Sequence, residues 1–189
     1  GGVSKTWLAR WLAWQAHDLA RPIGWIECSQ KAVTVESLVD SIASATQNRR
    51  IGGLLANTEA QPAVGASDPL ASALDECTDA LDRFQCILFL DDFHDLSARV
   101  ATALEYRFLA HVIPGLQGGR LVIVSRRTPA VWDDPKLKPF QQRIRLQGFT
   151  EEETGAFLAS RHVPLRPGLM EQLRHKTGHG VPMALELLS

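Results

Sequence analysis

The first six residues of the chain combine residue types that can bind phosphate. They are Gly1, Gly2, Val3, Ser4, Lys5 and Thr6. Glycines let backbone N–H groups approach phosphate oxygens, and the N-terminus of a following helix favours an anion. A lysine reaches the β- and γ-phosphates, and a threonine hydroxyl is a hard oxygen ligand for Mg²⁺. The segment therefore predicts the second half of a phosphate-binding loop, and the alternative is a glycine-rich helix start.

The match to the phosphate-loop pattern is incomplete at two positions. The first glycine of the pattern would fall ahead of Gly1, and Ser4 stands where the second glycine belongs. The serine adds a side chain beside the phosphates. A degenerate loop that binds without hydrolysing is therefore one of the alternatives.

Two carboxylates follow a continuously apolar run. Residues 86–90 form the run, and Asp91 and Asp92 come directly after it. In open α/β sheets ligands bind at the carboxyl ends of strands, and a charge there is costly unless something uses it. Asp91 is predicted to hold Mg²⁺ and Asp92 to position an attacking water. The alternative is that both aspartates are solvated caps of a turn.

A second buried run also ends in polar and cationic residues. Residues 121–124 are apolar, and Ser125, Arg126 and Arg127 follow. An arginine at such a strand end can contact a γ-phosphate and report its presence. Arg126 is therefore a candidate sensor, and the alternative is a pair of solvated surface arginines.

Helices and strands alternate around these motifs. Residues 5–19 read as a helix in which Trp7, Trp11 and Trp14 share one face, and we expect this stripe to pack against a sheet. Thr34 and Asp68 are predicted N-caps of two further helices. Residues 48–68 read as a loop. The predicted strands are 23–28, 86–90, 121–124 and, as an edge strand, 143–146.

This alternation predicts an α/β fold with a parallel sheet and right-handed crossovers. After residue 147 the pattern becomes helical. Thr150 and Glu153 form a predicted capping box before a helix that carries Phe157 and Leu158, and two more helices are expected near Pro167 and Pro182. We expect a three-layer core over residues 1–148 and a helical lid subdomain over 149–189.

The composition excludes several classes of protein. The 189 residues carry 20 basic and 21 acidic side chains, so there is no electrostatic footprint for nucleic acid. The apolar runs are far shorter than the roughly 20 residues of a membrane helix. The chain does not open on a signal-peptide pattern. Three isolated cysteines speak against a zinc or disulfide framework and predict a reducing, cytoplasmic setting.

In their order along the chain, these motifs resemble those of signal-transduction ATPases with numerous domains, the STAND class, which includes the NB-ARC proteins and the maltose-regulator type of activator. The tip at 90–94, Leu-Asp-Asp-Phe-His, resembles a Walker B segment. Residues 122–126 with Pro129 resemble the sensor strand. Residues 148–158 resemble the entry to the lid, and Gly180-Val181-Pro182 resembles the GxP motif that ends it.

The resemblance implies a cytoplasmic switch that binds ATP or ADP with Mg²⁺ and hydrolyses ATP slowly. It implies that residues 1–6 hold phosphates, that Thr6 and Asp91 hold the metal and that Asp92 positions water. It further implies that Arg126 senses the γ-phosphate, while Pro182 brings the lid against the base. It also implies that this chain is a fragment of a longer one with sensor and effector domains. It implies nucleotide-dependent self-association, and no direct contact of this segment with nucleic acid or membrane.

Two alternatives stay open. A partition-type or motor ATPase can carry a similar Gly-Gly-Val-x-Lys-Thr loop, although it lacks the lid and the GxP turn. A P-loop scaffold that no longer hydrolyses would explain Ser4.

Overall fold

The computed structural model describes residues 3–29, 33–56, 68–146, 150–160 and 162. The chain divides into two compact units, and each is considered by itself. One unit is formed by residues 9–142, and the other by residues 1–8 together with 143–189.

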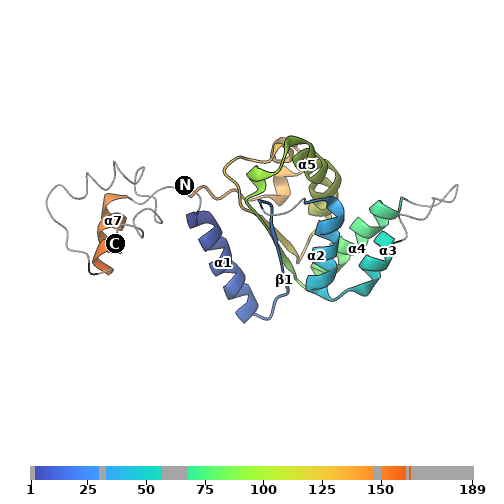
Figure 1. Ribbon diagram of the computed structural model, residues 1–189, viewed down its shortest axis with the longest axis horizontal. Coiled ribbons are helices and arrows are strands. Elements are labelled where there is room, and N and C mark those ends of the chain that lie inside the picture. The colour runs from blue at the N-terminus through green and yellow to red at the C-terminus, as the bar shows by residue number, and fades with distance from the viewer. Residues whose placement is uncertain (1–2, 30–32, 57–67, 147–149, 161, 163–189) are drawn as a thin grey trace. The chain divides into compact units, whose positions relative to one another are not determined.

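Three parallel strands form the centre of the 9–142 unit. They are β1 (Ile23–Glu27), β2 (Ile87–Asp91) and β3 (Arg120–Ile123), in the spatial order β1-β2-β3. In the β1–β2 ladder Glu27 lies opposite Asp91, and in the β2–β3 ladder Leu90 lies opposite Ile123. The predicted parallel α/β sheet is confirmed, and its carboxyl ends meet at one edge around the central strand β2 (Figure 1).

Helices connect and cover these strands. The α-helices are α1 (Val3–Asp18), α2 (Val35–Thr46), α3 (Arg49–Ala56), α4 (Pro69–Arg83), α5 (Ala98–Ala103), α6 (Ala110–Val112) and α7 (Glu151–Ser160). A π-helix, η2 (Leu104–Leu109), joins α5 to α6. The described residues also contain four short 3-10 helices: η1 (Phe93–Asp95), η3 (Ile113–Gly115), η4 (Ala130–Asp133) and η5 (Lys138–Phe140).

The two faces of the sheet bury different side chains. Leu88 and Leu90 of β2 point into a large apolar core with helices α2 and α4, whereas Phe89 points to the other face and packs with Ala9 of α1 and Val124. This is the period-two alternation of a strand that is covered on both sides. In residues 9–142 the sheet therefore has helices on both faces (Figure 1).

The predicted helix caps are present. The backbone N–H of Ser37 donates to Thr34 Oγ1 at 3.2 Å, and that of Thr34 donates to Ser37 Oγ at 2.9 Å. Asp68 accepts from the N–H of Leu70 at 3.0 Å, with proline at the first position of α4. Each cap satisfies N–H groups that the first turn of a helix leaves unpaired.

The prediction that the tryptophan stripe packs against the sheet is wrong. Trp7, Trp11 and Trp14 are 64%, 43% and 59% exposed. The face of α1 that contacts the sheet carries Ala9 and Ala13 instead. The sheet already presents two large rings there, since Trp25 and Phe89 stack with centroids 5.0 Å apart. Small alanine side chains let the helix backbone approach these rings, and the tryptophans face outward.

The predicted edge strand at residues 143–146 is also wrong. Residues 141–146 form no regular element, and Ile144 and Leu146 are 71% and 41% exposed. In the described part of the chain β3 has β2 as its only strand neighbour. A strand persists only through the ladder to a neighbour, and alternating sequence alone does not supply one.

The segment predicted as a loop at 48–68 contains a helix. Helix α3 spans Arg49–Ala56, and its Ile51 is fully buried in the main core. Asn48 accepts from the N–H of Arg50 and donates to Glu76 of α4, which fixes the start of the helix. Residues 57–67 lie outside the described residues.

In the second unit, α7 begins at the predicted capping box. The N–H of Thr150 donates to Glu153 Oε2 at 2.7 Å, and that of Glu153 donates to Thr150 Oγ1 at 3.2 Å. Leu158 is 2% exposed, as expected for an inward-facing residue. The side chain of Phe157 and the helices expected near Pro167 and Pro182 lie outside the described residues. Of the helices that are described, none is long and apolar enough to cross a membrane.

Candidate functional site

The central strand ends in a buried carboxylate. Asp91 is the last residue of β2 and is only 1% exposed. Its Oδ1 accepts the backbone N–H of Asp92 at 3.0 Å, and its carbonyl accepts the N–H of Cys28 at 2.9 Å. A carboxylate kept out of water in this way requires compensating interactions, and the structure places it where ligands bind in open α/β sheets.

Asp92 lies beyond the strand. Its φ of 51° and ψ of 39° are left-handed, and it precedes the 3-10 helix η1. The side chain of Phe93 is buried in the main core, and its N–H donates to the carbonyl of Val124 at 3.0 Å. The turn is therefore anchored to β2 and to the end of β3, and its polar side chains are held at the carboxyl edge of the sheet.

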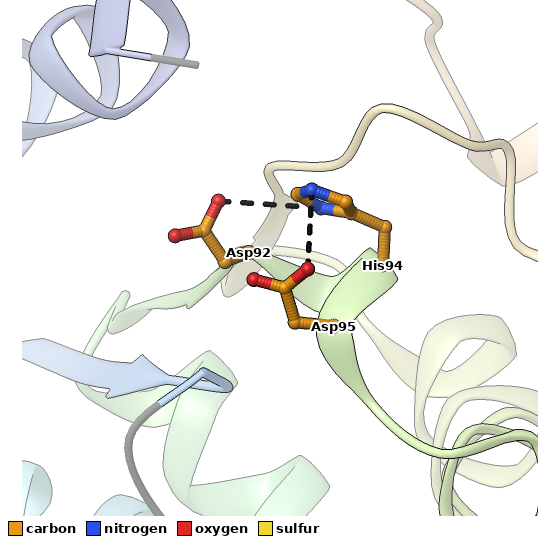
Figure 2. Close-up of side chains that lie close together, drawn as sticks. All are labelled: Asp92, His94 and Asp95. Carbon is orange, nitrogen blue, oxygen red and sulfur yellow. Dashed lines mark ion pairs between the residues drawn. The ribbon is translucent and has the colours of Figure 1, made fainter. Parts of the chain in front are cut away.

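This turn gathers one histidine and two aspartates, as Figure 2 shows. His94 Nδ1 lies 4.0 Å from Asp92 Oδ1, and His94 Nε2 lies 3.4 Å from Asp95 Oδ1. The His94 side chain is 9% exposed, and neither ring nitrogen has a hydrogen-bond partner among the described residues. The aspartates are more open, at 28% and 48% side-chain exposure.

The same edge of the sheet has a negative electrostatic character. Burial raises the pKa of the Cys28 thiol to about 12, and the charges of Asp91, Asp92 and Asp95 add to the rise. In the described part of the chain neither Asp92 nor Asp95 forms an ion pair with a lysine or arginine. Asp92 and Asp95 thus carry negative charge that no described lysine or arginine pairs with, which favours a cation.

The predicted phosphate loop is described only in part. Helix α1 begins at Val3, so Lys5 and Thr6 lie in its first turns, where a helix N-terminus favours anions. Both residues are half-buried. Gly1 and Gly2, and the side chains of Val3 and Ser4, lie outside the described residues, as does Pro182.

Arg126 lies three residues beyond the end of β3 and is exposed. Since β3 runs parallel to β2, Arg126 lies after the same end of the sheet as Asp91.

The backbone segment that follows Arg126 is held in place by Glu105, a residue that sequence reasoning missed. Glu105 of η2 is 6% exposed, and its Oε2 accepts the N–H of Val131 at 2.8 Å. Nothing in the sequence marks this carboxylate, because its partner is a backbone group in a distant segment.

Sequence reasoning gave no role to His94, which it noted only as the last residue of the Walker B-like tip, and none to Asp95. One signal was available: residues 92 and 95 are three apart, and side chains three apart eclipse one another on a 3-10 turn. The signal becomes visible only once the turn after the strand is known to be a 3-10 turn.

Comparisons with known proteins give distant structural likenesses. No family model and no curated protein matches the chain. The Orc1 protein of Aeropyrum pernix, solved in complex with DNA, is similar over 95% of this chain and 47% of its own, with 18% identity and a TM-score of 0.47. The chain thus spans about half the length of that protein.

Domain III of the Thermotoga maritima replication initiation protein DnaA is similar over 96% of this chain and 80% of its own, with 15% identity and a TM-score of 0.35. The α/β class of the chain rests on its own parallel strands.

Proposed function

We propose that the chain binds ATP and ADP with Mg²⁺ and acts as a signal-transduction switch of the STAND type, with slow ATP hydrolysis. One observation carries the proposal. Asp91 is a buried carboxylate at the carboxyl end of the central parallel strand, at 1% exposure. It lies where ligands bind in open α/β sheets, and carboxylate oxygens are the kind of ligand that Mg²⁺ prefers.

Each residue has a separate proposed role. Residues 1–6 bind phosphates, with the charge of Lys5 on the β- and γ-phosphates and the hydroxyl of Thr6 on Mg²⁺. Asp91 holds the metal ion, and Asp92 positions the attacking water. Arg126 contacts the γ-phosphate, and its exposed place after β3 leaves it accessible. Pro182 places the lid against the base of the nucleotide.

The switch works by population shift. Contacts to the γ-phosphate favour one arrangement of the lid, and loss of that phosphate releases it. A switch of this kind retains ADP, whereas a motor or partition ATPase releases ADP in order to turn over again.

The test is substitution of Lys5 in the intact protein. We expect Lys5→Ala to weaken ATP binding about a hundredfold, which is about 2.7 kcal/mol, because it removes a charge-assisted contact to phosphate. Calorimetric titration with Mg²⁺-ATP measures this change. The matched control is Lys136→Ala, which removes a lysine from an exposed loop and should leave the affinity unchanged.

Equal ATP affinity in Lys5→Ala and Lys136→Ala would refute the phosphate-loop role. Rapid release of ADP by the unmodified protein would instead favour a motor over a switch, because only the latter must hold its product.

A further inference from the structure

The cluster of Asp92, His94 and Asp95 is not explained by nucleotide binding alone. Asp92 has a proposed part in hydrolysis, but nothing in that proposal uses His94 or Asp95. A histidine that is 9% exposed, with two ring nitrogens that lack hydrogen-bond partners among the described residues, is an unusual arrangement. A buried polar group without a partner is unfavourable, so such a group in a folded protein calls for an explanation.

The distances in the cluster are too long for hydrogen bonds. The His94 Nε2–Asp95 Oδ1 distance suits a shared ion, toward which Asp92, now nearest to Nδ1, would have to turn. His94 Nε2 and Asp95 Oδ1 are 3.4 Å apart, beyond the usual hydrogen-bond range of about 2.7–3.2 Å. Two ligands at about 2.0–2.1 Å from one tetrahedral ion lie about 3.4 Å from each other. One ligand atom from each of the three residues falls within 4.8 Å of the others. Figure 2 shows the three side chains turned toward one another.

We infer that Asp92, His94 and Asp95 form a binding site for a divalent transition-metal ion of the zinc type. One imidazole nitrogen and one oxygen from each carboxylate supply three protein ligands, and water completes the coordination. The ion gives one ring nitrogen of His94 the bond that neither nitrogen forms among the described residues, and it neutralises the two carboxylates.

The ligand set selects the class of ion. Imidazole nitrogen suits zinc and its neighbours in the first transition row, whereas Mg²⁺ prefers oxygen ligands and keeps much of its water. The aspartates are partly exposed and free of lysine or arginine partners in the described part of the chain, so their side chains can adjust to the ion. The turn that carries them is fixed by the burial of Phe93 and its bond to Val124.

The test is calorimetric titration of the intact, nucleotide-free protein with Zn²⁺ at pH 7.5. We expect one ion per chain at this site. His94→Gln and Asp95→Asn should each weaken binding at least tenfold, since each removes one of three ligands. Mg²⁺ at an equal concentration should not displace Zn²⁺. Asp95 is half-exposed, so Asp95→Asn keeps the test available even if the buried His94 variant fails to fold.

The matched control is His111→Gln. His111 Nε2 lies 2.8 Å from Asp75 Oδ1, which makes an exposed histidine–aspartate pair, and no second carboxylate pairs with His111 among the described residues. This variant should bind Zn²⁺ as the unmodified protein does. A second readout is the imidazole NMR spectrum, in which Zn²⁺ should shift the His94 resonances and leave those of His111 in place.

Three results would overturn the inference. The first is no Zn²⁺ binding, which would leave His94 as a buried ring between two carboxylates. The second is binding that His94→Gln and Asp95→Asn leave unchanged. The third is displacement of Zn²⁺ by an equal concentration of Mg²⁺. Every zinc titration omits nucleotide, so a failure to bind Zn²⁺ would not affect the proposed nucleotide function. A failure to bind ATP would likewise not affect the proposed zinc site.

Discussion

Asp91 and Asp92 are neighbours in the chain but occupy different environments. Asp91 ends the strand and is buried, whereas Asp92 is 28% exposed at its side chain and adopts a left-handed backbone conformation. Adjacent residues on one strand would point to opposite faces of the sheet. This does not apply to the pair, because the strand ends at Asp91. Their different burial still supports different roles.

The first prediction separates these roles by Asp91→Asn and Asp92→Asn. Asn tolerates the left-handed conformation at 92 and retains an acceptor oxygen at 91, so both variants should keep the turn. Asp91→Asn should bind Mg²⁺-ATP poorly, because it removes a metal-holding charge. Asp92→Asn should bind ATP normally and hydrolyse it at least tenfold more slowly, because water attacks the γ-phosphate only in the chemical step.

Nucleotide retention and single-turnover hydrolysis measure the two effects, in Mg²⁺ buffer freed of transition metals. Equal loss of binding in both variants would contradict the division of roles. No loss in either would make the two aspartates caps of the turn.

Single residues show where sequence reasoning succeeds and where it stops. The sequence marked Asp91 and Asp92 because an apolar run followed by two acids is a local pattern. It could not mark Glu105, whose partner is the N–H of Val131, 26 residues away. It also gave His94 no role, because burial of that ring depends on how Phe93 anchors the turn in the core.

At the scale of elements, the carboxylate of Asp82 holds the backbone segment that leads into β3. Asp82 near the end of α4 accepts the N–H groups of Gln117, Gly118 and Gly119 at 2.7–2.9 Å. Gly119 approaches α4 so closely that a Cβ there would lie 2.9 Å from backbone atoms of Leu81. Partial burial pushes the pKa of Asp82 up, but these N–H groups and the nearby charge of Arg120 outweigh it, so the pKa is lowered overall.

The second prediction follows from this contact. Asp82→Asn should lower the free energy of unfolding by about 1–2 kcal/mol at pH 7, since it weakens several charge-assisted hydrogen bonds. A lowered native pKa means that the carboxylate stabilises the fold above its unfolded-state pKa of about 3.9. The stabilisation is lost as the pH falls through the native pKa.

Urea unfolding at a series of pH values checks both statements. The gap between the unmodified protein and Asp82→Asn should shrink as the pH drops below about 4. The control is Asp79→Asn, an exposed acid on the same helix, which should change stability little. A gap that stays constant down to pH 2 would contradict the role given to the Asp82 charge.

Whole elements were predicted well where the signal was local. The caps at Thr34, Asp68 and Thr150 depend on residues two or three positions apart, and all three are present. The orientation of α1 was predicted wrongly, because alanines and tryptophans on this helix repeat with the same helical spacing. Periodicity shows that a helix has two faces, and the sheet decides which face is buried. Residues 143–146 show a related limit, because a strand requires a neighbour that its own sequence does not contain.

At the scale of the molecule, three free cysteines from different elements are buried in one apolar core. Cys28 follows β1, Cys77 belongs to α4, and Cys86 precedes β2, yet all three are buried in the same apolar cluster. Burial raises the pKa of Cys28 and Cys77 to about 12 and that of Cys86 to about 11. Because the thiolate is the reactive form, the native thiols should be nearly inert at neutral pH.

The third prediction is that the three cysteines become reactive together. An aromatic disulfide reagent at pH 8 should label none of them quickly in the native protein and all three in guanidinium chloride. With excess reagent, the slow native labelling should have the same free energy of opening at each position, equal to that of global unfolding. Mass spectrometry of digested samples assigns the rates to each cysteine. If Cys28 reacted far faster than Cys77, the carboxyl edge of the sheet would open separately from the helices that cover it. The candidate site would then lie on a locally mobile part of the sheet and not on a rigid one.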